Sequence, residues 1–309
     1  IGLVLFAAVL LSNFTGYLLP WDQLAYWAIT ISTSMLDYLP VVGTGLRQWI
    51  LGGSEPGPGT LMNFYAIHTA ILPVLLVFFV PFHFWRIRKA NGLVIPRKSE
   101  NEPLTADEMV DSMPHLIIRE AAIALLVLAA VLLISMFYNA PLGEQANPGL
   151  SPNPTKAPWY FMGIQEMLIH FHPLFALLLI PGLIVLGLLW IPYFNYQAST
   201  AGIWFGSVKG RKMALAAALF AIVATVAAVW LDDYAAASYN AGPAGLVRNG
   251  LLPFTVLLAV CAGFYWLVKR TFRANNNEAI QAMFTLIVTS FVVLTMIGVW
   301  FRGAGMQLG

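Results

Sequence analysis

Residues 64–85 read FYAIHTAILPVLLVFFVPFHFW, and this stretch decides the fold of the chain. It is apolar or aromatic throughout, apart from one threonine and two histidines, His68 and His83. About 20 consecutive apolar residues are enough for a helix to cross a membrane. Ionisable side chains inside such a span are costly, so each one marks a candidate functional site. The stretch therefore predicts a transmembrane helix that carries two functional histidines.

The spacing of the two histidines indicates what they bind. On a helix, fifteen steps of about 100° end roughly 60° past four full turns, so both rings lie on nearly the same face. They stand about 22 Å apart along the axis, one near each side of a hydrocarbon layer ~30 Å thick. Imidazole is a standard axial ligand of haem iron. The pair favours two haems stacked across the membrane, while two histidines hydrogen-bonded between packed helices remain the alternative.

The composition is that of a protein embedded in a membrane. Of the 309 residues, 59% are hydrophobic and only 10% are charged, whereas a soluble domain carries about 25% charged residues. The net charge of +2 gives no support for nucleic-acid binding. The single cysteine, Cys261, excludes an internal disulfide, a cysteine-ligated iron–sulfur cluster and a CxxCH haem site within this chain.

The apolar runs predict an all-α bundle of about six full transmembrane spans, with a partial span at the start. We expect these helices at residues 1–19 (the partial span), 65–85, 116–137, 174–193, 213–230, 252–268 and 280–300. Residues 22–39 are amphipathic and predict a helix on the membrane surface, and the Gly/Pro cluster at 52–59 predicts a loop. The chain opens at Ile1 inside an apolar run. We therefore expect the preceding helices in another polypeptide or in an upstream part of the sequence.

The basic residues predict the orientation in the membrane. Eleven of the sixteen Lys and Arg residues lie in three alternate loops: Arg86, Arg88, Lys89, Arg97, Lys98, Lys209, Arg211, Lys212, Lys269, Arg270 and Arg273. Basic loops face the cytoplasm or its equivalent. His68 is then near the outer side and His83 near the inner side, with Asp232 and Asp233 outside. The expected location is a bacterial cytoplasmic membrane or an equivalent energy-transducing membrane.

Two outer segments are rich in aromatic residues and prolines. In residues 14–23, FTGYLLPWDQ, a glycine and a proline can end a membrane helix, and the aromatic side chains suit an interfacial anchor. The stiff loop at 141–161 ends in Trp159, Tyr160 and Phe161. It could form a pocket for a flat apolar ring, or it could be packing material.

Glu166 follows that loop in a locally apolar stretch. Desolvation there would raise the pKa of its carboxyl, and such a group can take up a proton near neutral pH. The alternative is a glutamate whose side chain simply reaches water.

Several stretches resemble the cytochrome b/b6 proteins, the quinol-oxidising core of bc1 and b6f complexes. Residues 14–28, FTGYLLPWDQLAYWA, resemble the end of the family's third helix and the surface helix after it. Residues 64–92 resemble its fourth helix, and the interval of fifteen between the histidines is b6-like. Residues 141–161, PLGEQANPGLSPNPTKAPWYF, resemble the loop before the PEWY quinol-site motif of bacterial menaquinol-type relatives, and residues 298–309, GVWFRGAGMQLG, resemble the end of their last helix. The resemblance covers residues 1–193 well and residues 278–309 less firmly.

The resemblance implies that His68 binds the iron of an outer haem b and His83 that of an inner haem b. It also implies cofactor contacts from Gly16, Arg86 and Arg88. In the family each iron has a second histidine from an earlier helix, and no histidine precedes His68 in this sequence. We therefore expect the second axial ligands to come from outside this sequence.

The resemblance also implies a quinol site on the outer side. Its residues would be Trp21, Asp22, Pro158, Trp159 and Phe161. The glutamate of the family motif is replaced here by Pro158. This departure leaves Glu166 as the candidate carboxylate, which would accept or relay the protons of quinol together with Tyr160.

An inner quinone site is predicted from position alone. It would involve Arg86, Arg88, Asp111 or His115, on the basic side of the membrane.

The function that the resemblance implies is that of a haem b-binding subunit of a membrane quinol:cytochrome c oxidoreductase. Electrons would cross the membrane between two b haems, with quinol oxidised outside and protons translocated. The expected partners are a Rieske-type iron–sulfur protein, cytochrome c, lipid, a menaquinol-type substrate and the chain with the missing helices, in a dimeric complex. A di-haem membrane anchor of another dehydrogenase would lack the outer loop. A haem-free transporter or structural subunit is the other alternative.

The resemblance further divides the chain into three parts. Residues 1–95 would form the end of a b6-like haem-binding domain and residues 96–194 a subunit-IV-like quinol-site domain. Residues 195–309 would add transmembrane helices, two of which carry no recognisable motif.

Overall fold

The computed structural model describes residues 1–90, 111–194, 205, 207–235 and 243–309. In this part of the chain the structure is helical, with two isolated β-bridges and no strands. Six helices are long and apolar enough to cross a membrane, and α1 (Gly2–Leu18) is a shorter apolar helix. The prediction of an all-α bundle with six full spans and a partial first span is therefore confirmed.

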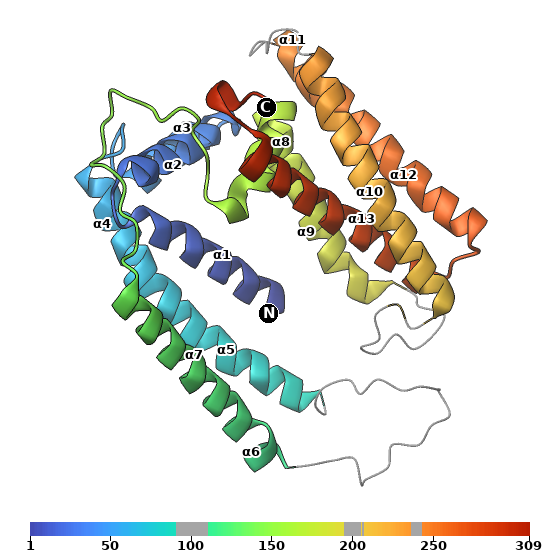
Figure 1. The fold of residues 1–309 in the computed structure, drawn as a ribbon, viewed down its shortest axis with the longest axis horizontal. Coiled ribbons are helices and arrows are strands. Elements are labelled where there is room, and N and C mark those ends of the chain that lie inside the picture. Colours follow the sequence, from blue (N-terminus) through green and yellow to red (C-terminus); the bar gives the residue numbers. More distant parts are fainter. Residues whose placement is uncertain (91–110, 195–204, 206, 236–242) are drawn as a thin grey trace.

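The histidine-bearing helix is longer than the apolar run that predicts it. It consists of α4 (Pro58–Ala66), a π-helical turn η2 (Ile67–Ile71) and α5 (Leu72–Lys89). Pro58 stands at the first position of α4, where its missing N–H has no helical partner to lose. The last turn of α5 is basic, and its positive charges interact favourably with the negative end of the helix dipole. In Figure 1, α1 runs alongside α5.

Short helices connect α1 to α4 on one end of the molecule. These are α2 (Gln23–Ser34), η1 (Met35–Tyr38) and α3 (Gly43–Leu51). The helix predicted at 22–39 is confirmed, while α3 was not predicted. The loop predicted at 52–59 begins at Gly52, whose φ of +67° ends α3 in a left-handed conformation. It ends two residues early, because Pro58 already belongs to α4.

A small core holds these elements together. Leu18, Ile29, Leu51 and Phe64, one from each of α1, α2, α3 and α4, form one buried cluster. Burying a large apolar side chain contributes about 1.5–3 kcal/mol, so this cluster fixes the surface helices to the end of α1 and to the start of the histidine-bearing helix.

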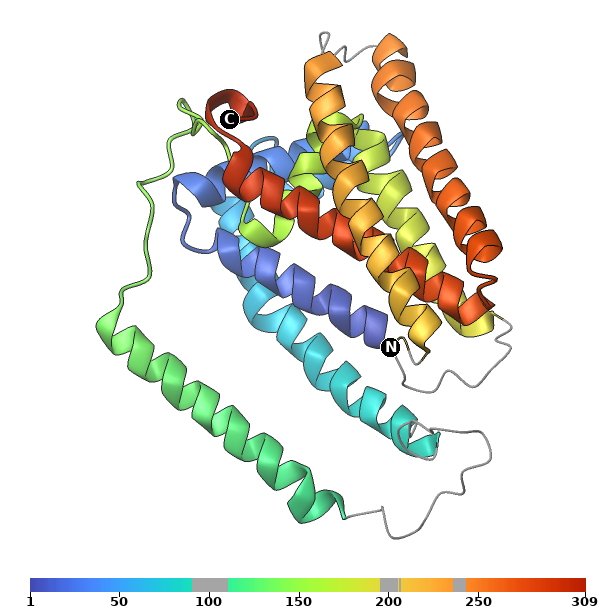
Figure 2. The ribbon, with the colours of Figure 1, turned by 45° about the vertical axis from the view of Figure 1, so that its right-hand side comes forward.

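The helix α7 (Ile117–Phe137) stands apart from the rest of the bundle (Figure 2). It follows α6 (Ser112–His115), and none of its residues is buried within the described part of the chain. Beyond Arg119 and Glu120 in its first turn, its side chains are almost all apolar around the helix, which a membrane permits because lipid tails are as apolar as leucine. A long segment at 138–158 then leads from α7 past α4 and the surface helices to α8 (Figure 1).

The second half of the chain is a separate group of helices. A short 3₁₀ turn η4 (Trp159–Phe161) leads into α8 (Met162–His170), followed by η5 (Phe175–Leu179), α9 (Ile180–Trp190) and η6 (Ile191–Tyr193). Then come α10 (Val208–Ala235), α11 (Pro243–Gly245), η7 (Leu246–Leu251), α12 (Leu252–Thr271), α13 (Asn276–Met296), η8 (Ile297–Phe301) and η9 (Ala304–Met306).

The two helices without a recognisable motif, α10 and α12, pack on α13. The contact uses small residues, which let helix backbones approach closely in a membrane: Ala217, Ala221, Ala279 and Ala282. Both predicted domain boundaries, after residues 95 and 194, lie at or within segments outside the described residues, as do Arg97 and Lys98.

Candidate functional site

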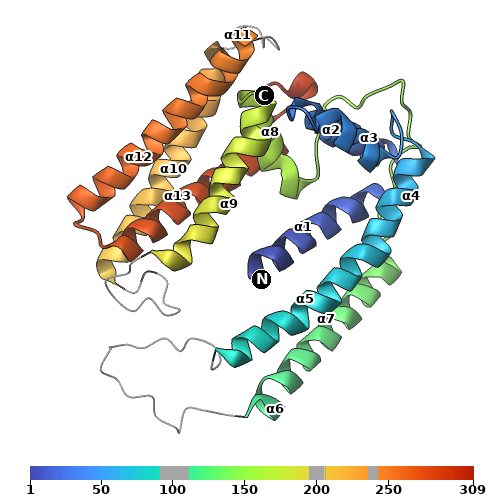
Figure 3. The same cartoon turned by 180° about the vertical axis from the view of Figure 1, so that it is seen from behind.

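His68 and His83 both lie against α1, as their spacing predicts. A Cβ atom on Gly16 would come within 2.8 Å of Cε1 of His68, and one on Gly2 would lie 4.0 Å from Cε1 of His83. Glycine at position 16 is therefore required for the His68 ring to reach the backbone of α1. Figure 3 shows α1 along the same side of α4 and α5 over its length. His68 itself lies in the π-helical turn η2, a feature that often marks functional sites.

A hydrogen bond sets the tautomer of His68. The hydroxyl of Thr15 lies 2.8 Å from the carbonyl oxygen of Leu11, to which it donates, and 3.0 Å from Nδ1 of His68. A hydroxyl has one proton to donate, so it accepts from Nδ1–H of His68. Nε2 then carries a free lone pair, as an iron ligand must. The residues around His68 thus fit a haem ligand, and His83 fits through its place against Gly2.

The proline-rich loop is fixed to the first turn of α2. Asp22 uses one carboxylate oxygen to cap that helix, accepting from Ala25 N at 2.9 Å, and the other to accept from Gly143 N at 3.0 Å. The backbone N–H of Gln23 donates to the carbonyl of Glu144 at 2.8 Å. A Cβ on Gly143 would meet the Asp22 carboxylate at 2.9 Å, so the loop needs glycine there.

Further along the loop, side chains of α2 take up its backbone groups. The Gln23 side chain accepts from the N–H of Asn147 at 2.6 Å and donates to the carbonyl of Leu150. The indole of Trp27 also donates to Leu150, at 3.1 Å. The loop is therefore held on the surface helix by hydrogen bonds between side chains of α2 and backbone groups of the loop.

The aromatic residues at the end of the loop reach α1. The hydroxyl of Tyr160 donates to the carbonyl of Asn13 at 3.3 Å, and the rings of Phe161 and Phe14 meet edge-on with centroids 5.6 Å apart. Burial raises the pKa of the Tyr160 phenol above its ordinary value. Tyr160 is therefore protonated at neutral pH, and it can accept a proton only after it has donated its own. Trp159 is 70% exposed, and its ring packs edge-on against that of Tyr160 with centroids 5.7 Å apart.

Two residues that the sequence did not single out hold the loop in front of α8. The side chain of Gln165 accepts from Ala157 N and donates to Thr155 O, both at 2.6 Å. Lys156 donates to the carbonyl of Val299 at 2.9 Å. Both contacts involve backbone groups, which a sequence pattern does not reveal.

Glu166 is fully buried and is paired with Arg302. Nε of Arg302 lies 2.9 Å and 3.2 Å from the two carboxylate oxygens, and Nη2 also donates to Oε1, so two guanidinium nitrogens hold the carboxylate. Burial alone would raise the pKa of the Glu166 carboxyl. Hydrogen bonds from His170 and Arg302 and the charge of Arg302 outweigh it and lower the pKa below its ordinary value. The expectation of a raised pKa is wrong, because the sequence showed the apolar neighbours of Glu166 but not its distant arginine.

Three more groups complete what we call the Arg302 cluster (Glu166, His170, Asp232, Asp233 and Arg302). His170 lies between two carboxylates, with Nε2 3.2 Å from Glu166 and Nδ1 2.7 Å from Asp232. Arg302 also donates to Asp233 at 2.7 Å. Burial would lower the pKa of His170, but the hydrogen bonds to Asp232 and Glu166 outweigh it and raise the pKa to about 9. The cluster joins α8, α10 and the residue after η8.

The sequence contained one signal for this cluster. The charge pattern predicts all five residues on the outer side of the membrane. It does not predict that they meet, because they come from three segments separated by more than 60 residues.

The residues predicted for an inner quinone site lie at the end of α5 and in or next to α6. Arg86, together with Lys89 and Ala90, lines a hollow of about 250 Å³. Arg88 belongs to the same helical turn of α5, Asp111 precedes α6, and His115 is its last residue.

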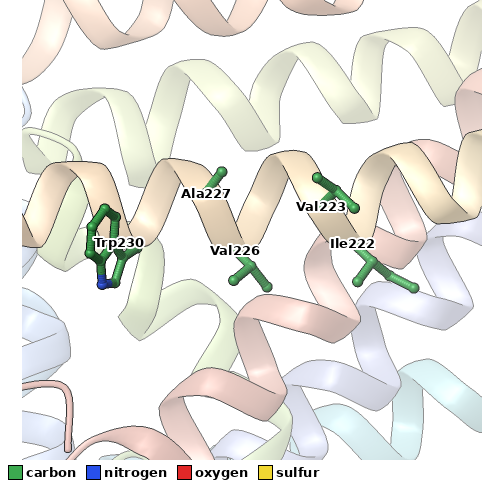
Figure 4. Close-up of a pocket in the computed structure, with 5 residues that line it drawn as sticks. All are labelled: Ile222, Val223, Val226, Ala227 and Trp230. Carbon is green, nitrogen blue, oxygen red and sulfur yellow. The ribbon is translucent and has the colours of Figure 1, made fainter.

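A second hollow, of about 450 Å³, lies along α10 and is lined only by apolar or aromatic side chains (Figure 4). Ile222, Val223, Val226, Ala227 and Trp230 line it. It contains no ionisable group.

Fold and site together define a class: an all-helical, multi-pass membrane protein with a histidine at each of two depths on one helix. Residues 1–154 match the family described as cytochrome b (N-terminal)/b6/petB. The chain belongs to the cytochrome b/b6 family through this N-terminal half, and membership implies that it binds haem b.

A solved structure titled "Hyperthermophilic respiratory Complex III" contains a chain of similar fold. The TM-score is 0.55 at 19% sequence identity, and the match covers 96% of this chain and 68% of that one. A match of that extent includes the extra helices α10 and α12.

Proposed function

We propose that this protein is the di-haem cytochrome b subunit of a membrane quinol:electron-acceptor oxidoreductase. The observation that carries the proposal is the placement of His68 and His83 against α1, where a Cβ on Gly16 would clash with the His68 ring. Two haems b, when bound, supply one-electron redox centres near opposite sides of the membrane. The chain's own part is to fix the depth and orientation of the two ligands.

The second axial ligand of each haem would come from outside this sequence. His170 is held by Glu166 and Asp232, and His172 packs edge-on against Tyr38 with ring centroids 5.4 Å apart. The proposed partners therefore include a chain or segment that carries a second pair of histidines.

The outer quinol site would lie between the start of α2 and the 3₁₀ turn η4. The contacts of Tyr160 with Asn13 and of Phe161 with Phe14 support this position, because they bring η4 to the last turns of α1, shortly before α2 begins. Trp21, Pro158, Trp159 and Phe161 would offer the apolar and aromatic surface for the quinol ring. Tyr160 would hydrogen-bond it. Glu166, ionised at neutral pH, would be the carboxylate on which released protons arrive.

The oxidation of quinol releases two protons and two electrons. The proposed electron acceptors are haem b and a Rieske-type iron–sulfur protein, followed by cytochrome c. With the basic loops on the cytoplasmic side, protons released outside and taken up inside would make the reaction electrogenic. Arg86 and Arg88 would serve a quinone site on the inner side, where the hollow beside Arg86 supports this assignment.

The alternative of a membrane anchor for another dehydrogenase has less support. An anchor has no use for a stiff outer loop, whereas here four hydrogen bonds of Asp22 and Gln23 hold the loop against α2.

The experiment is an assay of quinol oxidation by the complex purified with its partner subunits, using a short-chain menaquinol analogue. Phe161→Ala removes the ring between Tyr160 and Phe14 and should lower the rate about tenfold or more, with haem content unchanged. The control is Glu278→Gln, which should behave as the unaltered protein. Glu278 lies in the first turn of α13, where it pairs with Lys209 at 2.9 Å. An unaltered complex that oxidises no quinol contradicts the proposal.

A further inference from the structure

The Arg302 cluster runs from the interior of the protein to its surface. The Glu166 side chain is 0% exposed, that of His170 is 8% exposed and that of Asp232 is 54% exposed. The imidazole of His170 spans the gap between the two carboxylates, with one ring nitrogen toward each. A buried carboxylate is thus connected to solvent through a single ring that can take up a proton on one side and release it on the other.

The geometry around Nε2 of His170 requires two protonation states. Nε2 lies 3.2 Å from Glu166 Oε1 and 3.1 Å from Nη2 of Arg302, which can only donate. When Nε2 is protonated it donates to Glu166, and when it is unprotonated it accepts from Arg302. Each state of the ring therefore has its own hydrogen-bond partner, and a proton can come and go without leaving a buried polar atom unpaired.

The charges around the ring make His170 the group that changes its protonation. Its charged neighbours are Glu166 on α8, Asp232 and Asp233 on α10, and Arg302 after η8. Arg302 stays protonated, pairs with both Glu166 and Asp233, and lowers the pKa of the Glu166 carboxyl. Three carboxylates then stand against one fixed positive charge, and this excess of negative charge attracts a further proton to the ring.

We propose that Glu166, His170 and Asp232 form the exit path for protons released at the outer quinol site. The proposal rests on the proposed function, which supplies the protons. A proton from a quinol hydroxyl reaches the Glu166 carboxylate and passes to Nε2 of His170. Nδ1–H then gives its proton to Asp232, from which it passes to water. The neutral ring now carries its proton on Nε2, and its rotation turns the unprotonated nitrogen toward Glu166, where the next proton can be accepted. One proton enters and one leaves, and no electron moves in these steps.

Glu166, at the buried end, is the proposed acceptor of the quinol proton. His170 and Asp232 are relay residues that act through it. The neutral ring is the form that accepts a proton at Nε2, and its population grows as the pH rises toward about 9, where His170 titrates. A rate limited by this path therefore rises with pH over that range and levels off above it.

The test is the pH dependence of menaquinol-analogue oxidation by the purified complex with its partner subunits. His170→Ala should slow the reaction by at least about tenfold and abolish the rise with pH. Added imidazole should restore part of the rate, which a merely structural defect would not allow. Asp232→Asn, at an exposed position, should slow the reaction severalfold with its fold intact. Asp37→Asn is the control, because this carboxylate pairs with Arg47 at 2.8 Å, away from the cluster.

Two results would overturn the exit path. The first is that His170→Ala changes neither the rate of quinol oxidation nor its pH profile. The second is that His170→Ala slows the reaction and imidazole does not restore it, while Asp232→Asn oxidises quinol at the normal rate. If the unaltered complex oxidises quinol in these experiments, the proposed function stands and only the path falls. An unaltered complex without quinol oxidation removes both.

Discussion

At the scale of single residues, the structure connects each proposed role to one or two contacts. Thr15 sets the tautomer of His68, Gly16 gives its ring room, and Arg302 determines the charge state of Glu166. All three of these partners are more than 50 residues away in the chain from the group they influence. Sequence reasoning named the histidines and Glu166 but missed the charge state of Glu166, because an ion pair depends on the fold.

Thr15→Val tests the tautomer assignment. Valine keeps the shape but cannot accept from Nδ1–H of His68, and loss of a ligand's outer partner typically costs 10–100-fold in metal affinity. We expect the outer haem to dissociate more readily and its midpoint potential to shift, as measured by redox titration of the purified complex. Thr30→Val is the control, because Thr30 bonds only within α2. An unchanged potential and haem content would contradict the assignment.

Gly16→Ala tests the close approach of α1 to His68. The added methyl group would lie 2.8 Å from Cε1, so the ring has to move and haem binding should weaken. Gly182→Ala, in α9, is the matched control, since a Cβ there meets nothing within 4 Å. Haem content by absorption spectroscopy should fall in the first variant and remain normal in the second. Equal haem content in both variants would rule out the close approach.

The stability of the Arg302 cluster should depend on pH in a defined direction. The pKa of His170 is raised from 6.5 to about 9, so its contribution is fully present below pH 6.5 and is lost as the pH rises through about 9. The pKa of Glu166 is lowered from 4.5, so its contribution is present above pH 4.5 and is lost as the pH falls below it. The thermal unfolding temperature of the complex should therefore be highest between pH 4.5 and pH 6.5.

His170→Gln isolates the alkaline part of that dependence. Glutamine keeps hydrogen bonding but carries no titrating proton, so the loss of stability between pH 6.5 and about 9 should become smaller. If the variant and the unaltered protein show the same alkaline loss, His170 does not titrate as inferred.

At the scale of elements, the sequence predicted the apolar helices well and the outer surface poorly. Long apolar runs leave the chain no alternative to a helix in lipid, because every backbone polar group has to be satisfied within the segment. The histidine-bearing helix extends beyond its apolar run, because Pro58 at its first position and the basic residues up to Lys89 set its ends. The contact between the proline-rich loop and α2 could not be predicted, because it joins a loop backbone N–H to a side chain 121 residues away in sequence.

Asp22→Ala tests that contact. It removes the cap of α2 and the acceptor for Gly143, and loss of a helix cap alone costs about 1 kcal/mol. We expect the loop at 138–158 to be cleaved faster by added protease and quinol oxidation to slow. Asp37→Ala, which removes an exposed carboxylate from η1, should leave the cleavage rate unchanged. Equal cleavage in the two variants would exclude a clamping role for Asp22.

At the scale of the whole molecule, the fold and the family followed from the sequence, while the arrangement of the outer site did not. Residues 14–28 and 64–92 carried the family resemblance, and the match over residues 1–154 bears it out. Residues 298–309 carried it less firmly, and α10 and α12 carry no such motif. Their role in positioning Asp232, Asp233 and Arg302 beside Glu166 emerged only from the packing of α8, α10 and α13.

The central claim is that His68 and His83 each bind one haem b. The most direct test counts the haems b of the purified complex by pyridine haemochrome spectroscopy and redox titration. The account predicts two b-type centres of different midpoint potential, with one lost in His68→Ala and the other lost in His83→Ala. A complex that keeps both centres in either variant, or that contains no b-type haem, would contradict the account.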